Sequence, residues 1–145
     1  EKRKEITTEG GLNLNYKRNF LKKIINKLKK NKSRISLFIE PNQLDIKKAK
    51  LLNADCIEIH TGKFCNLVNQ KKNFKNELNK IKKAVKFGNN IGLEVHAGHG
   101  LNYKSAKILS KTKGIKEFNI GHFLIGESIF VGLPNSIKQF KKIIK

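Results

Sequence analysis

Four short apolar runs, each followed by a helical pattern, constrain the fold of this chain more than any other feature. The runs lie at 34–40 (RISLFIE), 56–60 (CIEIH), 92–96 (GLEVH) and 117–120 (EFNI). Short, β-branched apolar runs bounded by turn residues are typical of buried strands in parallel sheets. The sequence therefore predicts four strands, each followed by helical segments.

Helical periodicity occupies the intervals between these runs. Between residues 16 and 30, apolar residues recur at helical spacing from Phe20 onward, and further helices are expected over 44–52, 74–85, 103–111 and 136–144. We expect 61–69 to be a loop and 123–131 to be a short apolar helical segment, and we expect Gly88 with Asn89-Asn90 to be the stop signal of the helix before them. Strands that alternate with helices of this length predict a parallel sheet with right-handed crossovers.

Two α/β architectures fit this alternation, an open doubly wound sheet and a TIM-type (β/α)8 barrel. The barrel is favoured because no GxGxxG or Walker A turn follows a strand, and because polar residues gather where the strands end. A complete barrel needs about 250 residues. Residues 1–145 are therefore expected to form a single domain, the C-terminal half of a barrel with about four βα units and without its N-terminal strands.

The formal net charge of +21 raises the alternative of a basic nucleic-acid-binding protein. The basic residues are spread through every expected helix, and no RNP, KH or helix-turn-helix signature accompanies them. Their alternation with apolar positions predicts solvated helix faces. The pairs in question are Lys22-Lys23, Lys29-Lys30, Lys71-Lys72, Lys82-Lys83 and Lys141-Lys142. We expect no nucleic-acid partner.

Other sequence features indicate the localisation of the protein, the state of its cysteines and the extent of the chain. No run approaches the roughly 18 apolar residues of a membrane span, so a cytoplasmic protein without a membrane partner is expected. Cys56 and Cys65 lack CxxC or zinc-type spacing, and free thiols are expected. The chain contains no Met and opens on EKRKEITTEGG, which suggests a fragment.

Glu58 and His60 are the first candidates for a functional site. Both belong to the run CIEIH and are two residues apart, so their side chains point to the same face of the expected strand. A buried carboxylate is costly unless it has partners or a purpose. Glu58 is either a structural ion-pair residue inside the barrel or a catalytic carboxylate.

Two glycine-rich turns follow the last two strands. In HAGHG, Gly98 and Gly100 flank His99, which is either a proton donor at the barrel mouth or a turn residue bonded to a nearby carbonyl. In NIGH, the backbone N–H groups of Gly121 and His122 at a helix start would bind phosphate, unless this is a plain strand-to-helix turn. Gly10 and Gly11, after Thr7 and Thr8, form a third loop that could hold a polar substrate.

These segments together resemble the pyridoxine 5'-phosphate synthase family. TTEGG, EIHTG, AGHGL and NIGH occur in the family's order and spacing, and the resemblance covers essentially all 145 residues. It implies a (β/α)8 barrel that assembles as a homo-octamer. It also implies condensation of 1-deoxy-D-xylulose 5-phosphate with 3-amino-2-oxopropyl phosphate to pyridoxine 5'-phosphate, phosphate and water, without a metal or organic cofactor.

The resemblance also implies residue roles. Thr7 would contact the deoxyxylulose phosphate, Glu58 would stabilise charge during the reaction, and His99 would donate a proton. Gly100, Gly121 and His122 would hold the amino-oxopropyl phosphate. His96 stands where the family usually has Asn, so no catalytic role is transferred to it.

The family's remaining catalytic His and Glu belong to N-terminal strands that this chain lacks. We therefore expect the chain alone to be inactive, with open sheet edges and an exposed apolar lumen that favours aggregation. Another phosphosugar-processing barrel with the same phosphate loops stays open as an alternative function.

Overall fold

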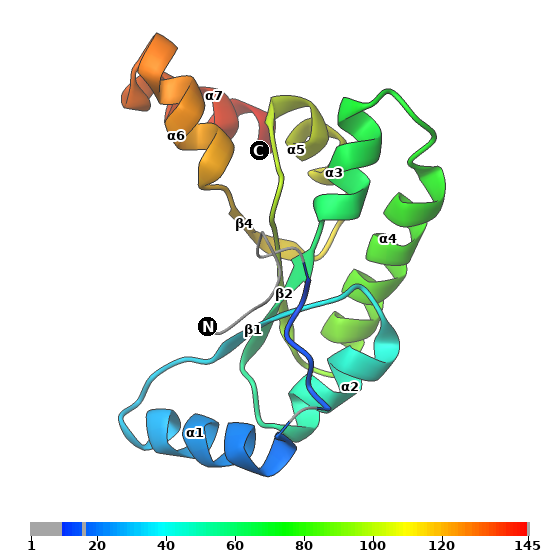
Figure 1. The fold of residues 1–145 in the computed structure, drawn as a ribbon, viewed down its shortest axis with the longest axis vertical. Coiled ribbons are helices and arrows are strands. Elements are labelled where there is room, and N and C mark those ends of the chain that lie inside the picture. Colours follow the sequence, from blue (N-terminus) through cyan, green and yellow to red (C-terminus); the bar gives the residue numbers. More distant parts are fainter. Residues whose placement is uncertain (1–9, 16, 145) are drawn as a thin grey trace.

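The computed structural model describes residues 10–15 and 17–144 as a parallel four-stranded sheet with helices. The strands are β1 (Ser36–Ile39), β2 (Cys56–His60), β3 (Glu94–Gly98) and β4 (Ile115–Asn119). The helices are α1 (Arg18–Lys30), α2 (Gln43–Leu51), α3 (Gly62–Asn69), α4 (Lys75–Asn90), α5 (Tyr103–Leu109), α6 (His122–Val131) and α7 (Leu133–Ile144). The strands lie in sequence order, β1-β2-β3-β4, and every pair is parallel (Figure 1). The predicted α/β fold with four βα units is confirmed.

The outer face of the sheet is apolar and packs against helices. Ile57, Ile59, Val95 and Ala97 are fully buried there, and α2 and α4 lie along this side of the sheet (Figure 1). Gly88 lies in α4 where the helix comes close to the sheet, since an added Cβ would lie 2.8 Å from Val95 Cγ2. The helix ends at Asn90, within the predicted stop signal, but Gly88 itself lies inside α4 and its missing side chain serves close packing.

The inner face of the sheet is mostly polar, so the expected apolar lumen is wrong. Because side chains alternate along a strand, Glu58 and His60 of β2 point away from the helices, as do Glu94 and His96 of β3. His96 Nε2 lies 2.8 Å from Glu94 Oε1, and Arg34 Nη2 lies 2.7 Å from Glu94 Oε2. The hydrogen bond to His96, and then that from Arg34, lowers the pKa of the Glu94 carboxyl. Charged groups on this face therefore have partners.

Several element boundaries differ from those predicted. Segment 61–69, expected as a loop, contains α3, because Phe64, Cys65 and Val68 form a short apolar stripe that is fully buried. Among the strands, β1 is shorter than predicted, β3 runs two residues further and β4 starts earlier, and among the helices α7 begins at Leu133.

The cysteines follow the prediction, and the lysine pairs follow it with two exceptions. Every paired lysine is exposed except Lys29, which is half-buried and paired with Asp55 at 2.8 Å. For Lys71-Lys72 the predicted helix face is wrong, because this pair lies in the loop between α3 and α4. Cys56 and Cys65 are free and buried, and burial raises the pKa of the Cys65 thiol. Within the described part of the chain, no helix has both the length and the apolar character needed to cross a membrane.

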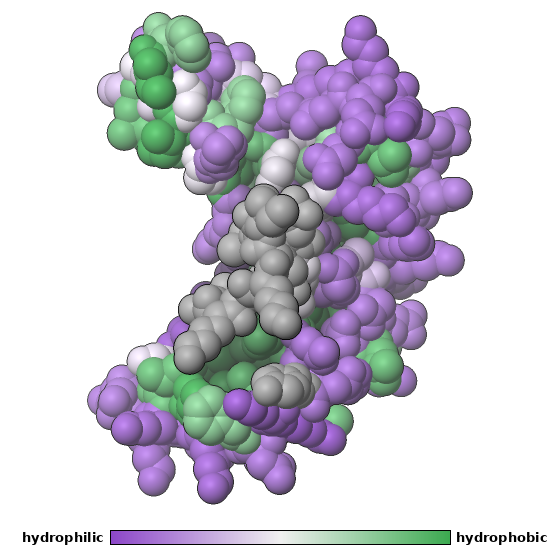
Figure 2. Space-filling view, viewed as in Figure 1, coloured by the Kyte–Doolittle hydropathy of each residue, from purple (hydrophilic) through white to green (hydrophobic). Residues whose placement is uncertain are grey.

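Apolar side chains are exposed at both ends of the molecule. On α1, Phe20 is 58% exposed and only Ile25 is buried, although the predicted apolar stripe is present. On α6, Ile129 is 79% and Phe130 85% exposed, and no residue of the helix is buried. Figure 2 shows the hydrophobic surface that results near these two helices.

Candidate functional site

A hollow of about 530 Å³ lies at the carboxyl ends of β3 and β4. Its walls come from the loops after these strands and from α3; they are Asn66, Asn69, His99, Gly100, Leu101, Asn102, Asn119, Ile120, Gly121, His122 and Phe123. A second hollow of about 360 Å³ shares Asn66, His99 and Gly100 with it and extends toward His60 and Lys63. In parallel α/β proteins ligands bind at this end of the strands. The two hollows together are the candidate active site.

Glu58 has a fixed carboxylate and is linked to this site through Asn119, which lines the larger hollow. Asn119 Nδ2 donates a hydrogen bond of 2.7 Å to Glu58 Oε2. Gly98 leaves the space that the other carboxylate oxygen occupies, since a Cβ there would overlap Glu58 Oε1. The half-buried Glu58 is therefore held by two neighbouring strands in an orientation that a larger residue at position 98 would not permit.

His99 lies in a strained turn between the two hollows. Both His99 and Gly100 have a φ of 77°, a conformation that costs energy for a side chain such as histidine. The turn is fastened to the end of β2, because the Thr61 hydroxyl lies 2.7 Å from the carbonyl oxygens of both Gly98 and His99. Gly100 packs closely against α3, where an added Cβ would lie 3.2 Å from Cys65 Cβ. Strain of this kind is characteristic of functional sites.

Gly121 and His122 lie at the N-terminus of α6, on the opposite wall of the larger hollow. Gly121 is the N-cap of the helix, and its carbonyl oxygen accepts the Ile125 N–H at 3.0 Å. The first N–H groups of a helix have no partner within the helix and carry a partial positive charge. This end of the site is therefore suited to an anion such as phosphate.

The sequence-predicted residues thus fall into three groups. The first group surrounds the larger hollow. It consists of His99 with Gly100, Gly121 with His122, and Glu58, which reaches the hollow through its bond with Asn119. His96 lies below them on the inner face and bonds Glu94. Thr7 lies outside the described residues. The roles of these residues stay predictions.

The structure adds a histidine–carboxylate pair that the sequence reading did not assign. Glu40, just after β1, has its Oε1 3.0 Å from His60 Nδ1. The same oxygen accepts the Gly11 N–H at 2.9 Å. Gly11 has no room for a side chain, because a Cβ would lie 2.5 Å from the Glu40 nitrogen. The double glycine therefore brings the backbone against β1, and the only sequence signal for the pair was His60 on the same face as Glu58.

Metal ligands were also sought in the site. Across residues 10–15 and 17–144, no group of three or more His, Cys, Asp or Glu side chains is arranged to hold a metal ion.

Comparisons with known proteins assign the chain to a family. The family model described as pyridoxal phosphate biosynthesis protein PdxJ matches residues 1–145. A protein of Pelagibacter ubique named pyridoxine 5'-phosphate synthase is 58% identical over 143 residues, which are 99% of this chain and 60% of that protein. Proteins with the same name from Zymomonas mobilis and Syntrophotalea carbinolica are 47% and 45% identical over 99% of this chain, and it covers 56% and 60% of them. The chain thus spans about 60% of the length of these relatives.

Proposed function

Because the chain belongs to the PdxJ family of pyridoxal phosphate biosynthesis proteins, we propose that it carries part of a pyridoxine 5'-phosphate synthase active site. The reaction joins 1-deoxy-D-xylulose 5-phosphate to 3-amino-2-oxopropyl phosphate and closes a pyridine ring with loss of phosphate and water. The observation that carries the proposal is the gathering of a fixed carboxylate, a strained histidine and a helix N-terminus around one hollow. Each supplies something this chemistry needs.

His99 is the proposed proton donor. Imine formation, dehydration and ring closure each move protons near neutral pH, a task for which the imidazole ring is suited. The turn that carries His99 is fixed to β2 by the Thr61 hydroxyl, so the ring has a rigid support at the rim. A fixed donor avoids the cost of reorganisation at each transfer.

Glu58 is the proposed charge stabiliser, and the three backbone positions are the proposed phosphate ligands. Condensation of an amine with a ketone passes through cationic species, which a carboxylate held in place by Asn119 would stabilise. Gly100, Gly121 and His122 line the hollow where the partial positive charge of α6 lies, and they would bind the phosphate of 3-amino-2-oxopropyl phosphate. Thr7 would contact the deoxyxylulose phosphate.

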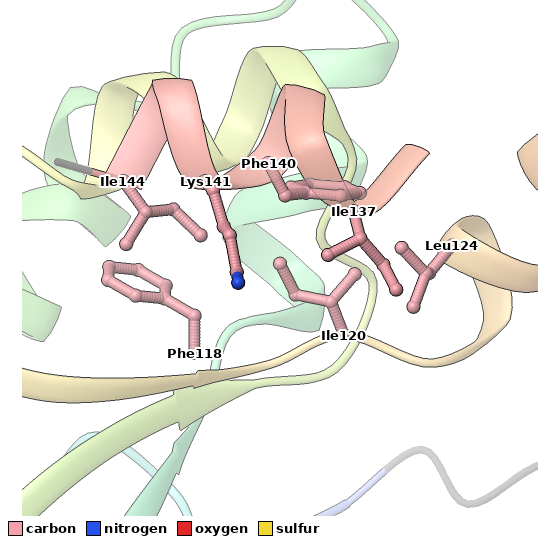
Figure 3. A pocket seen from close by; sticks show the side chains of 7 residues that line it. All are labelled: Phe118, Ile120, Leu124, Ile137, Phe140, Lys141 and Ile144. Atoms are coloured by element: carbon pink, nitrogen blue, oxygen red, sulfur yellow. The ribbon is translucent and has the colours of Figure 1, made fainter. Parts of the chain in front are cut away.

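We further propose that residues 1–145 are one domain, the C-terminal part of a (β/α)8 barrel whose N-terminal strands lie outside this sequence. The consecutive parallel order of the strands supports a barrel over a doubly wound sheet, whose strand order reverses. An apolar groove of about 400 Å³ between β4 and α7 also supports it (Figure 3). Phe118, Ile120, Ile137 and Ile144 line this groove, where the next helix of a closed barrel would pack.

The same proposal includes the localisation, assembly, cofactor use and substrate class that family membership implies. The enzyme would be a cytoplasmic homo-octamer that requires no cofactor and binds small phosphorylated substrates. The exposed apolar residues of α6, among them Ile129 and Phe130, support assembly, because soluble monomers rarely expose contiguous apolar surface of this kind.

Reconstitution tests the function. The purified chain alone is expected to give no pyridoxine 5'-phosphate from the two substrates. Supplementing it with the N-terminal barrel segment of the Pelagibacter ubique relative should restore product, followed by absorbance and mass. In the reconstituted enzyme, His99→Asn should lower kcat at least about 100-fold, and Glu58→Gln should also lower it.

Glu127→Gln, on α6, is the control and should leave the rate unchanged. Equal rates for His99→Asn and the unmodified enzyme would refute the role of His99. Turnover by the chain alone would refute the need for the additional strands.

A further inference from the structure

A buried nitrogen beside the candidate site has no partner. Among the described residues, two buried side-chain polar atoms make no hydrogen bond, and one of them is His60 Nε2. The His60 side chain is 9% exposed and lines the smaller hollow together with His99 and Gly62. Leaving a buried nitrogen unsatisfied costs about 1–3 kcal/mol, so such a group needs a functional or structural explanation.

The other ring nitrogen of His60 is fixed by Glu40. Glu40 Oε1 lies 3.0 Å from His60 Nδ1, and the Gly11 N–H holds the same oxygen in place at 2.9 Å. A carboxylate at one ring nitrogen keeps a proton on that nitrogen. In the neutral ring, Nε2 therefore carries a lone pair, and in the charged ring it carries a second N–H.

The ring of His60 packs against that of His99. The centroids of the two rings are 4.8 Å apart, and a Cβ on Gly62 would lie 2.7 Å from His60 Nε2 and 2.9 Å from His99 Cδ2. Both rings thus approach the same point above Gly62. A rotation of the His99 ring about its Cβ–Cγ bond would exchange that carbon with Nδ1 and turn a nitrogen toward this point.

Phe38 closes the remaining side of this ring pair. It packs edge-on against His60, with ring centroids 5.2 Å apart, and lies 6.0 Å from His99. The aromatic ring therefore supports the two imidazole rings on one side, while both histidines line the smaller hollow.

We propose that Glu40, His60 and His99 form a proton relay that reloads the proton donor of the active site. Glu40 and His60 are positioning residues here, since they act on substrate only through His99. The relay rests on the proposed role of His99 and names two members of the catalytic machinery that family membership did not assign.

One proton moves at each step of the relay. After His99 has given its proton to substrate, its deprotonated ring nitrogen takes the proton from Nε2–H of charged His60. His60 then returns to the neutral ring, with its Nδ1–H still donated to Glu40. A proton released by substrate during the condensation recharges Nε2, so the cycle consumes no oxidant or reductant.

Several charged or titratable side chains of the described residues lie around His60. They are Glu40 from the end of β1, Glu58 two residues earlier on the same face, Lys63 on α3 and His99 after β3. Glu58 accepts a hydrogen bond from Asn119, and Lys63 Nζ lies 3.1 Å from Glu77. Glu40 already holds Nδ1 of His60, so the proposed exchange takes place at Nε2, beside the ring of His99.

Nuclear magnetic resonance titration of the ring nitrogens tests the relay directly in the chain, without the need for turnover. The signals of His60 and His99 should change together with pH, as expected for two sites that share a proton. His60→Gln and Glu40→Gln should each move the titration midpoint of His99, while His122, an exposed histidine at the far wall, should titrate unchanged and report an intact fold.

Kinetics of the reconstituted enzyme give the second readout. His60→Gln should lower kcat about 10- to 100-fold with KM within about twofold, and Glu40→Gln should act in the same direction. Glu40→Asp, which keeps the carboxylate, should recover most of the rate, and Glu127→Gln should change nothing. A merely structural role for Glu40 predicts no such rescue and no change in the pH dependence of kcat.

The outcomes separate the two proposals. An identical His99 titration in the unmodified chain and both variants overturns the relay, whatever the activity. Coupled titration in a reconstituted protein that makes no product supports the relay as a proton-sharing pair and overturns the synthase function.

Discussion

The two central strands and the edge strand β4 differ sharply in how completely this chain buries them. In β2 and β3 nearly every residue is buried, whereas β4 has no fully buried residue and α6 after it has none. The central strands have helices on one face and paired polar groups on the other, while apolar residues beside β4 and on α6 remain exposed. The difference teaches that the central strands find their packing partners within the described residues, whereas the edge at β4 keeps apolar surface suited to further packing.

The largest expected contrast comes from two phenylalanines. Phe64 is 1% exposed and packs edge-on against Phe74, whereas Phe130 on α6 is 85% exposed. Phe64→Ala should lower the free energy of unfolding by about 3–5 kcal/mol, because it leaves a cavity in the core. Phe130→Ala should change it by less than about 0.5 kcal/mol. Urea unfolding followed by circular dichroism measures both, and equal losses would abolish the distinction between centre and edge.

A glycine pair tests the same comparison at smaller scale. Gly98→Ala forces the Glu58 carboxylate to move and should destabilise the chain by about 1–3 kcal/mol, while breaking the Asn119 hydrogen bond. At Gly126 on α6, an added Cβ would meet nothing within 4 Å, so Gly126→Ala should instead stabilise by about 0.5–1 kcal/mol. Thermal unfolding compares the two variants. A neutral Gly98→Ala would mean that the carboxylate is not confined there.

How much of this arrangement the sequence could predict depends on how far apart along the chain the contacting residues lie. The four strands and most helices follow from local periodicity, and Glu58, His99 and Gly121 were selected as candidates because chemistry concentrates at strand ends. α3 was missed because Gly62 and its short length conceal the stripe of Phe64 and Val68. The stop signal located the end of α4 at Asn90, but it could not show that Gly88 serves close packing inside the helix.

The polar contacts of the site lay beyond local patterns. Glu40 and His60 are 20 residues apart, and Glu40 and Gly11 are 29 apart, so only the register of β1 against β2 brings the pair together. The bonds from Thr61 to the turn at His99 likewise depend on the pairing of β2 with β3. The alternation of side chains identified the inner face, and tertiary pairing determined which groups on it meet.

The smallest expected effect concerns Asp55, which ties the start of β2 to neighbouring elements. The hydrogen bond from Lys29 Nζ (2.8 Å), and then that from the Ile35 N–H (2.9 Å), lowers the pKa of the Asp55 carboxyl. A lowered folded-state pKa stabilises the fold above the unfolded value of about 3.9, and this contribution is lost as the pH falls through the folded value. The unmodified chain should exceed Asp55→Asn by about 1 kcal/mol or less at pH 7, and the gap should close below about pH 4. Lys29→Gln should remove much of the same pH dependence, since it deletes the larger cause. If the stability difference between the unmodified chain and Asp55→Asn persists at pH 3 in urea unfolding, Asp55 acts through its hydrogen bond with the Ile35 N–H and not through its charge. The start of β2 would then be held by backbone hydrogen bonding.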